Sequence, residues 1–131
     1  MPRLLFRLYL RPGLMLVLFD HSTPAPLTSY LIGHTVTEGR DRGWDRLSNG
    51  DLLAEAERAG FHVLLTADKN IRYQQNLTGR KIAIVVLSTP QWPVVRLHTE
   101  RIAAAVSAAA PGSYVEANIP VETRGFKMGR I

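Results

Sequence analysis

Three short apolar runs constrain the fold of this chain more than any other feature of its sequence. They occupy residues 14–19 (LMLVLF), 62–65 (HVLL) and 82–87 (IAIVVL). A strand with one wet face alternates apolar and polar residues, whereas a strand covered on both faces does not need that alternation. The three runs therefore predict buried strands of a parallel sheet.

Helix signals fall between these runs. Residues 48–51 have the S-x-x-D form of a capping box, and Gly60 stands where a left-handed residue ends a helix. An apolar stripe lies between the two signals: Leu52, Leu53, Ala56 and Ala59. Their helical spacing predicts an amphipathic helix.

The rest of the chain predicts weaker elements. Ser22 or Thr23 can cap a short helix that Gly33 ends, and residues 34–37 form a weak strand. A helix is expected over residues 94–110, with four apolar side chains facing inward: Leu97, Ile102, Ala105 and Val106.

Strands that alternate with helices predict an α/β fold with helices on both faces of the sheet. We expect a single three-layer domain with a parallel sheet in the order 2-1-3-4, to which residues 113–117 can add a fifth strand. The domain spans residues 15–120, between a basic leader (residues 1–14) and a basic, flexible tail (residues 121–131). Two readings of the leader stay open: an amphipathic segment, or an extension that is not native, with Met15 as the start.

Composition excludes several function classes. The chain has no cysteine, which rules out disulfides, thiolate zinc sites and a cysteine nucleophile. No apolar run reaches the roughly 18 residues of a membrane span. The leader carries +3 and the tail +2, which together make up the formal net charge of +5. The balanced body therefore gives no general argument for a nucleic-acid partner.

Carboxylates follow two of the predicted strands. Asp20 comes directly after the first run, Asp68 follows the run at residues 62–65, and Asp51 opens the helix between them. The carboxyl ends of parallel strands meet at one sheet edge, where open α/β sheets bind ligands. Clustered carboxylates suit Mg²⁺ or Mn²⁺, and a metal held by them can activate water for phosphodiester hydrolysis.

Three blocks of this chain resemble PIN-like domains, in particular the short bacterial branch related to VapC-type toxins. They are LVLFD (residues 16–20), DLLAEAE (residues 51–57) and VLLTADKN (residues 63–70), and the similarity covers roughly residues 15–118. The resemblance implies an Mg²⁺- or Mn²⁺-dependent endoribonuclease in which Asp20, Asp51 and Asp68 are metal ligands and catalytic residues. It further implies single-stranded RNA as substrate, an antitoxin protein and a second copy of the chain as partners, and a cytoplasmic location.

The chain departs from this family at several positions. A further helix glutamate found in full-length relatives has no evident counterpart, and Glu38 and Asp45 are the acids available for that role. His21 stands where short relatives often have glutamate, and Asn70 where many have a second aspartate. His21 and Asp45 are therefore auxiliary candidates.

A basic segment follows Asp68. Residues 69–81 contain four cations and no acid. Phosphate contacts and base stacking are the expected modes of single-stranded RNA binding. The candidate RNA-binding residues are Lys69, Asn70, Arg72, Tyr73 and Gln74.

Other readings of these residues remain open at the level of sequence. The three aspartates can act as helix or turn caps, and the cations can form an ordinary solvated face. The fold can also belong to a catalytically weak or inactive nucleic-acid-binding module. A receiver-like signalling domain would use Asp20, Asp68 and Ser88 instead.

Overall fold

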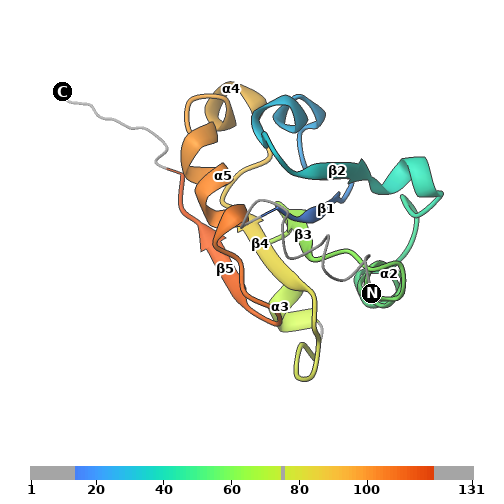
Figure 1. Ribbon diagram of the computed structural model, residues 1–131. Coiled ribbons are helices and arrows are strands. Elements are labelled where there is room, and N and C mark those ends of the chain that lie inside the picture. Colours follow the sequence, from blue (N-terminus) through green and yellow to red (C-terminus); the bar gives the residue numbers. More distant parts are fainter. Residues whose placement is uncertain (1–13, 75, 120–131) are drawn as a thin grey trace, which may run out of the picture.

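Five parallel strands form one sheet in the order β2-β1-β3-β4-β5 (Figure 1). The computed structural model describes residues 14–74 and 76–119, so all but one residue of the predicted leader and the whole tail lie outside the described residues. The strands are β1 (Leu16–Phe19), β2 (Thr35–Glu38), β3 (Val63–Thr66), β4 (Ala83–Leu87) and β5 (Tyr114–Ala117). The predicted order 2-1-3-4 is confirmed, and the optional fifth strand is present.

Helices cover both faces of the sheet. The α-helices are α2 (Asn49–Arg58), α3 (Ile71–Gln74), α4 (Trp92–Val95) and α5 (Thr99–Ser107), and two 3₁₀ helices are η1 (Ala25–Tyr30) and η2 (Gly39–Arg42). Figure 1 shows α4 and α5 on one side of the sheet and α2 and α3 on the other. The predicted three-layer α/β architecture is therefore confirmed.

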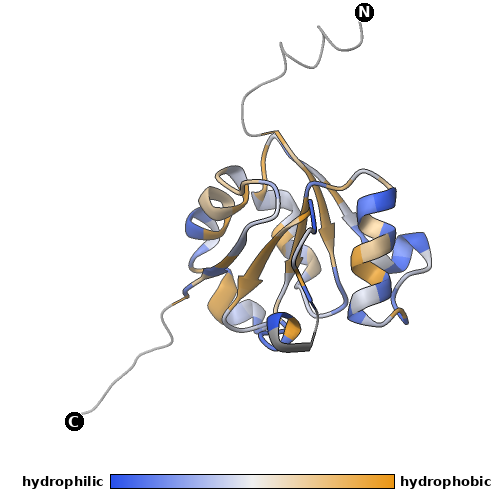
Figure 2. Ribbon diagram, turned by 90° about the horizontal axis from the view of Figure 1, so that it is seen from below, coloured by the Kyte–Doolittle hydropathy of each residue, from blue (hydrophilic) through white to orange (hydrophobic). Residues whose placement is uncertain are grey.

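Alternate residues of β1, β3 and β4 enter two separate cores. In β3, Val63 and Leu65 pack in the core under η1, α4 and α5, whereas Leu64 packs in the core under α2 and α3. Figure 2 shows the strands as mainly hydrophobic, with hydrophilic residues on the outer turns of the helices. Burial on both faces explains why the three runs lack polar alternation.

The capping signals of α2 are confirmed. The Ser48 side chain accepts a hydrogen bond from the Asp51 backbone N–H, and Gly60 follows the helix with a φ of 90°. Gly60 thus adopts the left-handed conformation that favours glycine at helix ends.

Two helix predictions need correction. Residues 94–110 do not form one helix, because α4 ends at Val95 and α5 begins only at Thr99. The break resets the helical phase, so Leu97 is 65% exposed, whereas Ile102 and Val106 are buried as expected.

The helix after Pro24 is a 3₁₀ helix without a side-chain cap. The predicted caps, Ser22 and Thr23, instead direct their hydroxyl groups to the Asp20 carboxylate.

Within residues 14–74 and 76–119, no helix has the length and apolar character to cross a membrane.

Candidate functional site

Asp20 is a buried carboxylate immediately after β1. Only 7% of it is exposed, and Oδ1 accepts hydrogen bonds from the Ser22 backbone N–H at 3.0 Å and the Ser22 hydroxyl at 2.7 Å. The Thr23 hydroxyl lies 3.1 Å from the same oxygen. Oδ2 accepts a hydrogen bond from the Thr66 hydroxyl. These donors compensate the desolvation of the carboxylate, which forms no ion pair with another described residue.

Thr66 links the ends of β1 and β3. It is the last residue of β3 and fully buried, and its Oγ1 accepts the Asp68 backbone N–H at 3.0 Å while donating to Asp20. The parallel register pairs Phe19 with Leu65, which places the next residues of the two strands side by side. Sheet geometry thus brings Asp20 and Asp68 to one edge, as the sequence predicts.

Asp68 is held by the start of α2. Its Oδ2 accepts the Asn49 side-chain N–H at 3.0 Å, and its Oδ1 accepts the Asn70 backbone N–H at 3.0 Å. Sequence reasoning missed Asn49 and Thr66 as parts of this site. The only signals were their positions, at the first residue of a predicted helix and two residues before Asp68.

Asp51 follows Asn49 by two residues in α2. Asp51 is exposed, and its backbone N–H donates a hydrogen bond to the Ser48 hydroxyl oxygen at 3.3 Å. The helix-capping reading of this segment is therefore correct for the backbone. Its role as a metal ligand or catalytic residue stays a prediction.

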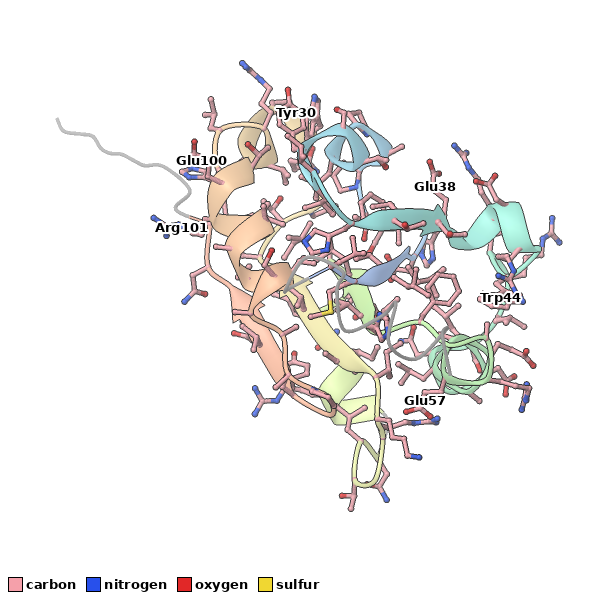
Figure 3. The ribbon with its side chains drawn as sticks, viewed as in Figure 1. Tyr30, Glu38, Trp44, Glu57, Glu100 and Arg101 are labelled. Atoms are coloured by element: carbon pink, nitrogen blue, oxygen red, sulfur yellow. The ribbon has the colours of Figure 1, made fainter. Side chains whose placement is uncertain are left out.

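A polar cavity of about 380 Å³ opens beside Asp20. It is lined by the ends of β1 and β2 and by the following loops, including His21, Glu38, Arg40 and Asp45. Glu38 pairs with Arg40 at 3.1 Å, and Figure 3 shows Glu38 at the end of β2 beside η2. The two auxiliary candidates, His21 and Asp45, thus share one cavity with Asp20.

The predicted RNA-binding residues have different surroundings. Lys69 and Asn70 are exposed, whereas the Arg72 guanidinium lies 3.9 Å from Glu116 and 5.0 Å from the centre of the Tyr114 ring. The side chains of Tyr73 and Gln74 lie outside the described part of the structure. Arg72 therefore contributes to the packing of α3 against β5, a role that sequence did not suggest.

The donor set at the sheet edge suits one Mg²⁺ or Mn²⁺. Magnesium is usually bound through one or two carboxylates, with water and phosphate oxygens completing its shell. An ionised carboxylate has about four acceptor positions, and Asp68 uses two of them. Two donors to Asp20, the hydroxyl groups of Ser22 and Thr66, can turn to other acceptors. The Thr23 hydroxyl has a closer acceptor in the Leu65 carbonyl oxygen, at 2.6 Å.

The described residues do not assemble a larger acidic cluster at this edge. Among the described residues, no group of three or more histidine, cysteine, aspartate or glutamate side chains is placed to hold a metal ion. The carboxylates available for a metal are therefore those of Asp20 and Asp68, which follow β1 and β3.

No protein-family model, curated protein or solved structure matches the chain. Its PIN-like identity stays a prediction that depends on the three sequence blocks.

Proposed function

We propose that the chain is a PIN-like, Mg²⁺- or Mn²⁺-dependent endoribonuclease that hydrolyses phosphodiester bonds in single-stranded RNA. The observation that carries this proposal is the pair of aspartates that follow β1 and β3. The Thr66 hydroxyl links them, because it donates to the Asp20 carboxylate and accepts the Asp68 backbone N–H. A structural carboxylate needs only its hydrogen-bond donors. Two carboxylates at the ligand-binding edge of a parallel sheet, one of which (Asp20) lines a polar cavity, favour a cation and a phosphate.

Each residue of the site has a separate role in the proposed reaction. Asp20 and Asp68 would supply the oxygens for the metal ion, and Asn49 and Thr66 would hold these carboxylates in position. Asp51 would orient a water molecule for attack on phosphorus. The bound ion would supply neutralisation of the phosphate charge and a lowered pKa of water.

Support for the proposed partners comes from the sequence resemblance. On that ground we include an antitoxin protein and a second copy of this chain as partners, within the cytoplasm. The exposed Lys69 would bind an RNA phosphate near Asp68.

The test is RNA cleavage by the purified chain. Cleavage should require Mg²⁺ or Mn²⁺ and stop with EDTA, and Asp20→Ala or Asp68→Ala should reduce the rate about 10²-fold or more, as losses of comparable catalytic groups do. Asp41→Ala, an exposed acid on η2, serves as the matched control and should cleave like the wild type. Equal rates of RNA cleavage by the wild type and Asp20→Ala would rule out the proposed ribonuclease activity.

The same experiment separates the alternative functions. A chain that binds RNA with no cleavage above that of Asp20→Ala is a nucleic-acid-binding module. A receiver-like domain would use the Ser88 hydroxyl near the acidic pair, but this hydroxyl exchanges hydrogen bonds with the backbone of Ile119. That contact favours the nuclease over the receiver.

A further inference from the structure

A cavity between described residues lies at the opposite edge of the sheet from Asp20. It has a volume of about 740 Å³ and is bounded by the start of β1, the C-terminal end of α2, the segment before β4 and the turn after α5. Ligand pockets commonly have volumes of about 300–1,000 Å³. The volume of the cavity is therefore sufficient for a small molecule.

The walls of this cavity combine an apolar interior with a cationic rim. Met15, Phe61, Ile82 and Ala109 contribute apolar surface. The charged lining residues are one acid and three cations: Glu57, Arg58, Arg80 and Lys81.

Hydrogen bonds keep the rim in place. The Glu57 carboxylate accepts the Arg80 guanidinium at 3.0 Å and the backbone N–H groups of Lys81 and Ile82. On the other side, the Gly112 backbone N–H donates to the Lys81 carbonyl at 2.9 Å. Figure 3 shows Glu57 where α2 approaches the segment that leads into β4. The cavity wall is thus preorganised, which reduces the entropic cost of binding.

The ion pairs leave one rim cation available. Arg80 pairs with Glu57, and Arg58 pairs with Glu55 at 2.6 Å. No ion pair between described residues involves Lys81, which is exposed. A ligand with an apolar body and one anionic group would suit this cavity. Its apolar body would be buried against the walls, and its anionic group would lie near the Lys81 ammonium.

We propose that this cavity binds a small amphipathic carboxylate, a monoanion with an apolar chain or ring. The chain's own leader is a poorer occupant, because Arg3, Arg7 and Arg11 repel a cationic rim and the leader has no acid. The site is distant from the acidic pair and does not depend on the nuclease proposal.

Octanoate is a suitable probe for calorimetric titration of the full chain. Octylammonium has the same apolar length and the opposite charge, and 1-octanol has no charge. Octanoate should bind at least about tenfold more tightly than octylammonium, with octanol between them. Equal affinities for octanoate and octylammonium would overturn the proposal.

Two variants locate the site. Lys81→Gln should weaken octanoate binding about tenfold, the effect of losing one charge-assisted hydrogen bond. Lys69→Gln, the same change on the opposite sheet edge, is the matched control and should bind octanoate like the wild type. If both variants lost the same octanoate affinity, the effect would be a general attraction between charges, and the proposed site would be wrong.

Ala54→Phe tests the apolar interior, because Ala54 lines the cavity from α2. The larger side chain should abolish octanoate binding, and a thermal unfolding curve verifies that the variant is folded. Undiminished binding in a folded Ala54→Phe variant would place octanoate elsewhere. Octanoate binding that appears only after removal of residues 1–13 would assign the cavity to the leader and overturn the proposal.

Discussion

The Thr66 hydroxyl connects the Asp20 carboxylate to the backbone N–H of Asp68, and the proposed activity depends on these two aspartates. Thr66→Val keeps the shape of the side chain but removes the donor to Asp20 and the acceptor for the Asp68 backbone N–H. Because it leaves a buried carboxylate with one donor fewer, the variant should lose about 1–3 kcal/mol of unfolding free energy. Urea denaturation measures this loss. Thr66→Ser retains the hydroxyl and should be clearly more stable than Thr66→Val; equal stability of the two variants would show that the hydroxyl contributes little.

Asp68 provides the second residue-scale prediction. If it helps to hold a cation, Mg²⁺ or Mn²⁺ should raise the melting temperature by mass action, because the ion binds only the folded chain. Asp68→Asn should remove this increase, while Asp41→Asn should retain it. Identical shifts in both variants would show that the metal binds elsewhere on the surface.

At the scale of elements, two histidines attach the start of β1 to its neighbouring strands. The His34 Nδ1 accepts the Met15 backbone N–H, and the His62 Nδ1 accepts the Leu16 backbone N–H, both at 2.9 Å. These bonds require unprotonated nitrogens. Burial lowers the pKa of His34 below its ordinary value, so the folded chain binds fewer protons there than the unfolded chain.

A group of this kind stabilises the fold above the unfolded pKa, about 6.5 for histidine, and loses its contribution as the pH falls through the folded pKa. The unfolding free energy should therefore decrease as the pH falls below about 6.5. His34→Asn can keep an acceptor near Nδ1 but does not titrate, so it should show a flatter dependence between about pH 7 and pH 5. A variant as acid-sensitive as the wild type would exclude His34 as a source of this effect.

Glu57 connects α2 to the segment before β4. Burial opposes ionisation, but hydrogen bonds from the Ile82 and Lys81 backbone N–H groups, together with Arg80, outweigh it and lower the pKa of Glu57. Since a lowered carboxyl pKa stabilises the fold above the unfolded value of about 4.3, this contribution should disappear as the pH falls through the folded pKa.

Glu57→Gln should consequently destabilise the chain by about 1–2 kcal/mol near pH 7, because a neutral amide accepts these hydrogen bonds less strongly. The difference from the wild type should shrink below about pH 4. Chemical denaturation at both pH values measures it, with Glu55→Gln as the control, since Glu55 pairs only with the exposed Arg58 among the described ion pairs. If the difference in unfolding free energy did not change with pH, the charge of Glu57 would not be its cause.

The whole molecule carries its excess charge at its ends. Residues 15–120 are balanced, while the leader and tail together provide the net +5. If RNA is first attracted by this charge, affinity should fall steeply with salt, and a chain without residues 1–13 and 121–131 should show a smaller slope of log affinity against log salt. Filter binding at several salt concentrations checks this. An unchanged slope would place the phosphate contacts on the domain itself, with Lys69 as the first residue to test.

The sequence by itself determined the features that depend on near neighbours along the chain. Strand burial follows from the runs at residues 14–19, 62–65 and 82–87, and the start of α2 follows from Ser48, because periodicity and capping need only a few adjacent residues. The parallel strand order also followed, since short crossovers leave few arrangements. Only the tertiary structure decided the contacts between distant residues.

Those contacts depend on the register of strands far apart in sequence. The pairing of Phe19 with Leu65 brings the Thr66 hydroxyl to Asp20, and the docking of α2 brings Asn49, two residues before Asp51, to Asp68. The tertiary structure also differs from the expected helix over residues 94–110, which is interrupted between Val95 and Thr99 and leaves Leu97 exposed. Side-chain contacts across such separations are set by the packing of whole elements, and local sequence does not encode that packing.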